Sequence, residues 1–514
     1  MRQYETFELI FKGKEPGENE SQANISAVFT VNGSEKKVKG FYDGNGICKV
    51  RFLPSETGIC EWKVDSSLEL EGELEGREEI LPAAEGRHGM VKPEGIHLVY
   101  EDGTRCIPFG TTVYALVHQP KGMIEQTFET LEHSPFNKVR MCVFPKHYDF
   151  NLNEPERFAF VMENGKPNVQ KPDYIFWKEF ETSLGRLNQD GIEADLILFH
   201  PYDHWGFAEL SYEEACIYLD YAVRRLAAFP NVWWSLANEY DLMEHFERGW
   251  WDGFAEQVSE QDVFGHMLSN HQCVTMWDFN NPYTTHCSVQ MGMTQRAAGF
   301  QKEFGKPVLF DEVGYEGNLP YSWGNLSAFE MVNRIWTGTV MGAYVTHGEV
   351  LYQDAGYNED AVLWWAKGGK LYGESMPRIA FLRGIMEELP GPLTAVTSSW
   401  DREAIRKKME DPEMAKTIPT VVKCIANMPD AQFQGFMDDF QEMTGTFEDQ
   451  VIMQYLGRHC NRWLDVQLPE EGRYTVEVID TWEMTREVVE TEASGLTKVW
   501  LPGKQGMAVL AKKN

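Results

Sequence analysis

The chain has 514 residues, of which 43% are hydrophobic and 13% aromatic, so it can fill large apolar cores and is not a disordered chain. This length exceeds that of one ordinary domain, and we expect two or three domains. The 79 acidic residues outnumber the 47 basic ones, for a formal net charge of −32, which argues against nucleic acid or an anionic membrane as a partner. A neutral substrate fits this charge better.

The sequence shows neither an export signal nor a membrane span. It has no run of about eighteen apolar residues, and its first residues lack a basic region followed by an apolar stretch of signal length. The nine cysteines include no CxxC pair and no spacing typical of zinc ligands. We therefore expect a cytoplasmic protein with reduced thiols, no metal and no cofactor.

The first 87 residues are rich in short strand-like segments, at 7–11, 27–31, 36–41, 48–52 and 60–64. Turn-forming clusters such as Asp43-Gly44-Asn45-Gly46 separate them, and no convincing helix interrupts them. Regular short strands with this punctuation are typical of an antiparallel β-sandwich. We predict such a domain over residues 1–87.

Residues 88–390 alternate apolar strand-like runs with amphipathic helices. The helix predicted over 172–188 carries apolar residues three and four positions apart, and the apolar run 194–200 follows it at once. A second helix over 215–229 leads in the same way into the run 232–239. Apolar strands that alternate with helices predict a parallel sheet covered by those helices.

Eight candidate strands occur in this region, at 107–114, 138–144, 195–200, 232–237, 267–271, 286–290, 308–311 and 343–347. Eight such units in about 300 residues are what a (β/α)8 barrel requires. The fifth and sixth are the weakest, because residues 273–279 compete for either place. An open doubly wound sheet is the alternative, but no glycine-rich phosphate-binding loop follows any of these strands.

Strand-like segments return in residues 391–514, at 420–425, 449–455, 463–466, 473–480, 498–501 and 507–511. They predict a second β-sandwich. The predicted fold is therefore of the α/β class, a (β/α)8 TIM barrel at 88–390 flanked by an N-terminal β-sandwich at 1–87 and a C-terminal β-sandwich at 391–514.

Two glutamates stand at the ends of strands four and seven, Glu239 after the run Trp233-Trp234-Ser235-Leu236-Ala237-Asn238 and Glu312 after Val308-Leu309-Phe310-Asp311. The catalytic groups of a parallel barrel lie at the carboxyl ends of its strands, and strands four and seven face each other across the mouth. Cleavage of a glycosidic bond needs one carboxyl group as acid and a second as nucleophile or base. The pair therefore predicts a glycosidase.

The two carboxyl groups are expected to differ in role. Glu239 is predicted to be the acid/base, its pKa raised by nearby negative charge and an aromatic wall, and Glu312 the nucleophile, kept ionised by a neighbour such as Arg140. Asn238 is placed to hydrogen-bond a sugar 2-hydroxyl. A retaining pair of this kind lies about 5 to 5.5 Å apart.

Further polar or aromatic residues follow the same strands and are candidates for substrate binding. The full predicted set is Asn238, Arg140, His200, Tyr202, Tyr114, His118, His286, Gln290, Trp323 and His347. A lone buried histidine or arginine is more often structural, so the set draws its weight from the shared position at one barrel face. Candidate sugar platforms are Trp205, Tyr240, Trp277, Tyr315, Trp323 and Trp364, about half of which are expected to be core.

The order of an arginine after strand two, Asn-Glu after strand four and Glu after strand seven resembles the large clan of retaining glycoside hydrolases with (β/α)8 barrels. More narrowly, the chain resembles the apiosidase-like bacterial catalytic domain, in the segments Pro108-Phe109-Gly110-Thr111-Thr112, Asn137-Lys138-Val139-Arg140-Met141, Trp234-Ser235-Leu236-Ala237-Asn238-Glu239 and Thr346-His347-Gly348-Glu349. The segment Gly40-Phe41-Tyr42-Asp43-Gly44 and the residues after it resemble the β-sandwich that often precedes such barrels. The resemblance implies hydrolysis of a glycoside or small oligosaccharide.

Two positions depart from the clan's pattern. Strand eight often ends in a tryptophan that holds the sugar, whereas here that place has His347. A tyrosine commonly supports the nucleophile from strand six, whereas the matching region has His286 and Gln290. We therefore expect the sugar ring to be held differently, and a pentose or another short sugar is one hypothesis.

Two other functions stay open at this point. A metal-dependent hydrolase would use the many strand-end histidines, although the early HxH pair usual for such sites is missing. A non-catalytic carbohydrate-binding protein would use the two sandwiches, but it has no need of two glutamates in these places. The sequence leaves the sugar, the linkage and the oligomeric state open, and flanking sandwiches could close the cleft of a neighbouring barrel in a homo-oligomer.

Overall fold

The computed structural model describes residues 1–353, 361–396, 402–440 and 443–514. The chain forms two compact units. The first comprises residues 1–292, 303–331 and 344–387, and the second comprises residues 293–302, 332–343 and 388–514. The two boundaries between the three domains predicted from the sequence stay predictions.

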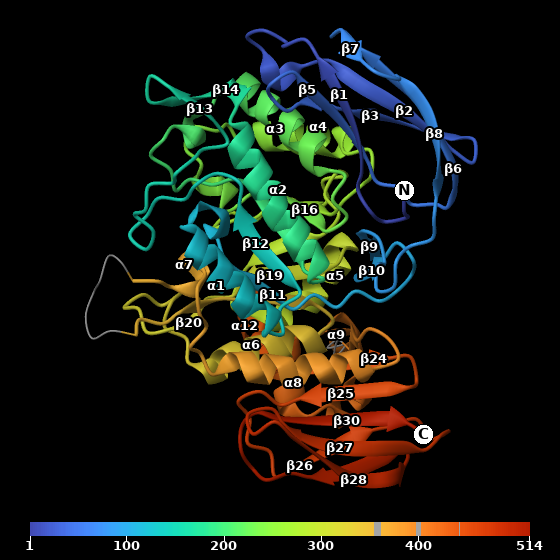
Figure 1. Cartoon of the computed structure of the whole chain (residues 1–514). Coiled ribbons are helices and arrows are strands. Elements are labelled where there is room, and N and C mark those ends of the chain that lie inside the picture. Colours follow the sequence, from blue (N-terminus) through green and yellow to red (C-terminus); the bar gives the residue numbers. More distant parts are fainter. Residues whose placement is uncertain (354–360, 397–401, 441–442) are drawn as a thin grey trace. The chain divides into compact units, whose positions relative to one another are not determined.

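Two four-stranded antiparallel sheets form the N-terminal part of the first unit, drawn in blue in Figure 1. One has the order β4 (Phe41–Tyr42), β5 (Ile47–Phe52), β1 (Phe7–Gly13), β7 (Leu70–Glu71), and the other the order β3 (Ser34–Lys39), β2 (Ile25–Val31), β6 (Gly58–Ser66), β8 (Glu75–Ile80). The rings of Phe29 on β2 and Phe52 on β5 stack with centroids 4.3 Å apart, so the two sheets share an aromatic core. This is the predicted sandwich.

Eight parallel strands form the central sheet of the first unit. Their order is β17 (Leu268–Ser269), β16 (Val232–Ala237), β15 (Glu193–Phe199), β12 (Lys138–Cys142), β11 (Gly110–Thr112), β21 (Tyr344–His347), β19 (Val308–Glu312), β18 (Cys287–Gln290). An isolated parallel bridge between His271 and Ser288 joins the two edges of this sheet. All eight predicted strands are present in the predicted chain order, and the fold is a TIM barrel.

Helices follow most of these strands along the chain. They are α1 (Lys121–Glu132), α2 (Tyr174–Gln189), α3 (Tyr212–Leu226), α4 (Trp250–Gln261), α5 (Ala297–Phe304), α6 (Ala328–Val340) and α8 (Ser375–Glu388). Asp173 caps α2 by accepting hydrogen bonds from two backbone N–H groups, and Ser211 with Glu214 forms a capping box on α3. Both predicted helices are present, α2 starting two residues after its predicted start and α3 three residues before it. No helix lies between β17 and β18, and residues 273–279 form no strand.

Additional short elements surround the strand ends. After β12 the chain forms a hairpin, β13 (Phe160–Glu163) and β14 (Lys166–Pro172). After β19 and β21 it forms β20 (Glu316–Gly317) and β22 (Glu349–Val350), which pair in parallel, and then α7 (Trp364–Lys367). β9 (Val91–Glu94) and β10 (His97–Tyr100) form a hairpin before β11. In the described ranges no helix is both long enough and apolar enough to cross a membrane.

The C-terminal part of the second unit contains a six-stranded antiparallel sheet, drawn in orange to red in Figure 1. Its order is β23 (Thr394–Ala395), β24 (Met443–Phe447), β25 (Val451–Tyr455), β30 (Met507–Lys513), β27 (Tyr474–Asp480), β28 (Thr485–Ala493). A two-stranded sheet of β26 (Trp463–Gln467) and β29 (Leu496–Trp500) shares one hydrophobic core with it, which includes Val466, Tyr474, Val499 and Val509. The second predicted β domain is therefore present.

One predicted strand is wrong. Residues 420–425 lie in a helix, α11 (Thr420–Ala426), one of four short helices with α9 (Arg402–Met409), α10 (Pro412–Thr417) and α12 (Asp430–Phe440). The β-branched residues of this segment favour a strand, but Pro419 stands at the helix N-cap position and Arg406 Nε donates to the Ala426 carbonyl at 2.7 Å. Packing against α9 outweighs the local propensity.

Candidate active site

Glu239 lies two residues after the end of β16 and has a left-handed backbone, with φ of 58°. This conformation is costly for a residue other than glycine and is often kept at active sites. Two contacts with His271 hold it, since the Glu239 N–H donates to His271 Nδ1 at 3.4 Å and the Tyr240 N–H donates to the His271 carbonyl at 2.9 Å. The strand end thus turns sharply and presents the Glu239 side chain.

The carboxylate of Glu239 is buried and has two side-chain donors. The Tyr202 hydroxyl donates to Oε2, and Gln290 Nε2 donates to Oε1 at 3.2 Å. Both donors belong to the predicted binding set. Gln290 also lies opposite Glu312 in the register of β18 and β19, so it brings the two glutamates to one place.

Glu312, the last residue of β19, is also buried. The Tyr114 hydroxyl donates to its Oε1 and lies 3.0 Å from Asn238 Oδ1. The Tyr315 hydroxyl lies 3.5 Å from that of Tyr114. Two tyrosines, from strands other than the sixth, therefore supply the hydroxyl support that the sequence did not offer at strand six.

The negative charge of Glu239 acts on the pKa of Glu312. Burial raises the pKa of Glu312 most, and with the negative charge of Glu239 it brings that pKa to about 7. Arg140, the Tyr114 hydroxyl and Lys146 act in the opposite direction. Arg140 thus acts on Glu312 in the direction expected from the sequence, but burial and the charge of Glu239 have the larger effect on its pKa.

Arg140 itself belongs to an ion-pair network inside the barrel. Its Nη1 lies 3.1 Å from Asp311 and 3.6 Å from Asp195, and Lys138 Nζ lies 2.7 Å from each of these aspartates. Burial alone would raise the pKa of Asp311, but the charges of Lys138 and Arg140 hold it well below its usual range. Arg140 reaches the site through Asn238, whose Oδ1 lies 3.4 Å from Arg140 Nη2.

Lys146 is a member of the site that the predicted set omits. Its ammonium group is buried and lies 3.5 Å from the ring centroid of Tyr114, 4.1 Å from that of Tyr202 and 4.9 Å from that of Tyr148. Burial lowers the pKa of Lys146, whereas Glu239 and Glu312 act against that shift. The cue in the sequence is its position after strand two, next to a run of aromatic residues.

The four predicted histidines are buried and hydrogen-bond elsewhere. The Nε2 atoms of His118 and His200 lie 3.2 Å from the carbonyls of Val143 and Phe144. The Nδ1 atoms of His286 and His347 lie 3.0 and 3.1 Å from threonine hydroxyls. Burial lowers the pKa of His200 to about 3 and that of His118 to about 4, so these rings are neutral at pH 7. We retain Tyr114, Asn238, Tyr202 and Gln290 as proposed binding residues.

Aromatic rings gather beside Tyr315. Trp323 is 37% exposed and packs on Tyr315 with centroids 5.9 Å apart, while Tyr321, 47% exposed, stacks on Trp323 at 5.5 Å. Gly348 allows this arrangement, because a Cβ there would lie 2.1 Å from the Tyr315 ring. The other predicted platforms are buried, namely Trp205, Tyr240, Trp277 and Trp364. Exposed rings of this kind can pack on the apolar face of a sugar.

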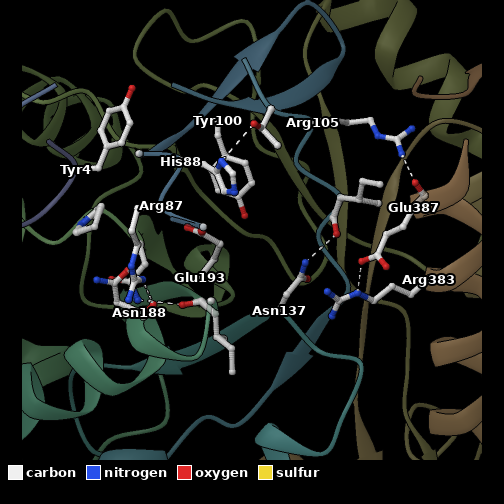
Figure 2. A pocket seen from close by; sticks show the side chains of 18 residues that line it. Tyr4, Arg87, His88, Tyr100, Arg105, Asn137, Asn188, Glu193, Arg383 and Glu387 are labelled. Carbon is white, nitrogen blue, oxygen red and sulfur yellow. Dashed lines mark hydrogen bonds and ion pairs between the residues drawn. The ribbon is translucent and has the colours of Figure 1, made fainter. Parts of the chain in front are cut away.

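A pocket of about 290 Å³ lies at the opposite end of the barrel. Its lining includes Asn137, Glu193 and Asn231, residues at or just before the amino ends of β12, β15 and β16. Asn137 and Glu193 are labelled in Figure 2. The active sites of these barrels form at the carboxyl ends of the strands, where Glu239 and Glu312 lie. The pocket of Figure 2 is therefore separate from the candidate active site.

Two groups of side chains in the described part of the chain have a spacing that could hold a metal ion. They are His147 with Glu154 and His204, and Glu316 with His347 and Glu349. Neither group contains Glu239 or Glu312.

Comparison with known families decides the classification of the barrel. The family described as "Apiosidase-like, catalytic domain" matches residues 92–388. The chain belongs to the apiosidase-like family. Members of this family are glycoside hydrolases, and the chain is an enzyme of that class. Two domains of unknown function flank the apiosidase-like region, DUF5060 at residues 1–67 and DUF5605 at residues 440–512.

Solved structures agree with this classification. The crystal structure of a "putative glycoside hydrolase" from Bacteroides vulgatus ATCC 8482 is 32% identical, covers 100% of this chain and 99% of its own, and has a TM-score of 0.86. A family 5 glycoside hydrolase from the same organism is 13% identical over 83% of this chain and 93% of its own, with a TM-score of 0.59, which bears on the fold alone. No curated protein matches the apiosidase-like chain significantly.

Proposed function

We propose that the chain hydrolyses a neutral glycoside or small oligosaccharide by a retaining double displacement, with Glu239 as acid/base and Glu312 as nucleophile. The observation that carries this proposal is the placement of two buried glutamates at the ends of β16 and β19, each bound by tyrosine hydroxyls. Two carboxyl groups in one buried site cannot both ionise freely near pH 7, so one proton is available for the leaving oxygen.

The assignment of roles follows from the neighbours of each carboxyl group. Once Glu239 holds the shared proton, its charge no longer raises the pKa of Glu312. Arg140, Lys146 and the Tyr114 hydroxyl then favour the Glu312 anion that must attack the anomeric carbon. Glu239 in this state can protonate the departing oxygen, and later it can remove a proton from the attacking water.

Substrate contacts are proposed for the polar groups that already bind the glutamates. Asn238 lies next to Glu239 and is held by Tyr114 and Arg140, which fits a hydrogen bond to the sugar 2-hydroxyl. Trp323 and Tyr321 are exposed and stacked, which fits a platform for the far end of the substrate. The two carboxyl groups favour a neutral sugar over an anionic one.

The test begins with a screen of aryl glycosides that includes pentofuranosides. We expect Glu239→Gln and Glu312→Gln each to lower kcat by about 10³-fold or more on a responsive glycoside. Glu193→Gln is the control, because Glu193 is a buried barrel glutamate at the opposite strand end and should leave kcat unchanged. Full activity in both active-site variants would contradict the proposal.

Stereochemistry separates retention from inversion. The wild-type chain should release the sugar with the anomeric configuration of the substrate, as followed by NMR at early times. Azide added to Glu239→Ala should yield a glycosyl azide of retained configuration, and azide added to Glu312→Ala one of inverted configuration. An inverted first product from the wild-type chain would exclude the double displacement.

A further inference from the structure

Two buried glutamates lie side by side outside the proposed catalytic pair. Glu316 on β20 and Glu349 on β22 are direct partners in a parallel pair of strands and are 4% and 2% exposed. Like charges directly opposite each other on a sheet are destabilising, and the effect grows when water is excluded. The pair therefore needs compensation from its surroundings.

Backbone amides provide part of that compensation. Glu349 accepts hydrogen bonds from the N–H groups of Tyr372 and Gly373, both at 2.7 Å. Glu316 accepts them from Glu374 at 2.8 Å and from Ser375, the first residue of α8, at 3.2 Å. Each carboxylate oxygen accepts one of these bonds, so each keeps a lone pair for another partner.

Positive charge is what the pair lacks. Among the described residues, no lysine or arginine forms an ion pair with Glu316 or Glu349. Buried carboxylates without a cation are rare unless they bind a proton or a metal ion.

His347 supplies the second observation. It is 1% exposed, its ring stacks on Phe136 at 4.8 Å, and its Nδ1 lies 3.1 Å from the Thr111 hydroxyl. Its Nε2 is buried and has no hydrogen-bond partner. One ring nitrogen of His347 and one oxygen each of Glu316 and Glu349 all lie within 4.8 Å of one another.

The hydrogen bond at Nδ1 fits a metal-binding histidine. When Nδ1–H donates to Thr111, Nε2 keeps a free lone pair, and the ring cannot turn away because Phe136 covers it. Thr111 is held in turn, since its hydroxyl accepts from Trp364 Nε1 at 2.8 Å. A second layer of hydrogen bonds of this kind commonly fixes the tautomer of a ligating imidazole.

We propose that Glu316, His347 and Glu349 bind one divalent transition-metal ion of the Zn²⁺ type. One imidazole and two carboxylates suit Zn²⁺ or Mn²⁺ better than Ca²⁺ or Mg²⁺, which prefer oxygen ligands only. Ligand atoms about 2.0 to 2.2 Å from such an ion lie roughly 3.4 Å apart, so small side-chain shifts close the cluster around it. The ion neutralises the pair and ties β20 and β22 to the start of α8.

This ion has a structural role and is independent of the glycosidase mechanism. Neither Glu239 nor Glu312 is a ligand, so metal binding and hydrolysis can be tested apart. The ion sits one residue from Tyr315, whose hydroxyl belongs to the active site, and its removal is expected to loosen that loop. Stability is therefore the direct readout.

The test uses the full chain purified without a metal column or chelator. Elemental analysis should find about one equivalent of Zn²⁺ or a similar ion per chain. Chelation should lower Tm, and adding back Zn²⁺ should restore it with saturation near one equivalent, whereas Ca²⁺ and Mg²⁺ should not. Co²⁺ bound to the wild-type chain should give visible absorption that Zn²⁺ removes, which keeps the test valid if a variant fails to fold.

Three variants locate the ion. Glu349→Gln should lose the bound metal and the response of Tm to chelation. Glu193→Gln, a buried glutamate elsewhere in the barrel, and His204→Ala, in the exposed group with His147 and Glu154, should keep both. The proposal fails if wild-type chain binds no ion under metal excess, or if His204→Ala and not Glu349→Gln removes it. It also fails if Glu349→Gln is as stable as the metal-supplied wild type, which would indicate a shared proton.

Discussion

At the scale of single residues, Lys146 shows how a buried positive charge acts on the proposed active site. Its ammonium group lies among the rings of Tyr114, Tyr148 and Tyr202, two of which donate hydroxyls to the proposed catalytic pair. A cation held over aromatic faces is attracted to them without being neutralised. Lys146 therefore acts on Glu312 as a fixed positive charge.

Lys146→Met should raise the pKa of Glu312, because a charge that favours the Glu312 anion is lost. The acidic limb of kcat/KM against pH should move to higher pH, and kcat/KM should fall by about 10-fold or more below neutrality. Lys146→Arg should keep the limb in place. Lys306→Met is the control, since Lys306 Nζ donates to backbone carbonyls of Phe279 and Asn281. An unshifted limb in Lys146→Met would show that Lys146 has no electrostatic role.

The sequence could predict the two glutamates but not the partners of Arg140. The position after a strand is visible in the sequence, and Glu239 and Glu312 both meet that rule. The sequence does not show which of the two consecutive carboxylates, Asp311 or Glu312, faces the barrel interior. Lys138 and Arg140, two residues apart on β12, share one face and meet Asp311, so Glu312 is left at the mouth.

At the scale of elements, the barrel is least continuous between β17 and β18. β17 has two residues, pairs with β16 at two positions, and reaches β18 through the single bridge of His271 and Ser288. The fifth and sixth strands were also the hardest to place from the sequence. β17 forms few backbone hydrogen bonds, which makes the barrel less continuous here. No helix follows it, so the sequence lacks the strand-helix periodicity that marks the other units.

Amide hydrogen exchange should therefore be faster in residues 268–271, which include β17, than in β15 and β16, although all of these residues are buried. β15 and β16 are paired along most of their length and serve as the internal reference. Mass spectrometry of peptides from each strand measures the difference. Equal protection at the seam and the reference would mean that side-chain packing, and not the ladder, holds the barrel closed.

The helix α11 shows a different limit of the sequence. Its residues prefer strands, and what makes them helical is packing on α9 and the hydrogen bonds from Arg402 and Arg406 to the carbonyl of Ala426. Such contacts join residues about twenty positions apart and leave no local pattern. Element type was predictable where apolar periodicity extended over several turns, as in α2 and α3, and not where short segments depend on their neighbours.

At the scale of the whole molecule, buried ion pairs join the N-terminal strands to the barrel helices within the first unit. Arg51 on β5 and Arg225 on α3 both bind Glu181 on α2, at 2.8 and 2.7 Å, and Arg225 also binds Asp43 at 2.7 Å. Arg51 is 5% exposed and Arg225 is fully buried. Removing one partner from such a network leaves a buried charge uncompensated, which typically costs about 3 to 5 kcal/mol.

Glu181 also predicts how stability depends on pH. Burial would raise its pKa, but the charges and hydrogen bonds of Arg51 and Arg225 hold it at about 2, below the value of about 4.3 expected in the unfolded chain. Its stabilisation is therefore present above about pH 4.3 and is lost as the pH falls toward 2. Glu181→Gln should lower Tm at pH 7, and the gap from wild type should narrow through that window. Glu179→Gln on the same helix is the control, because its pair with Lys121 is exposed and should matter little. A Tm gap that persists unchanged at the lowest pH would mean that packing of the Glu181 side chain, and not its charge, joins the strands to the barrel.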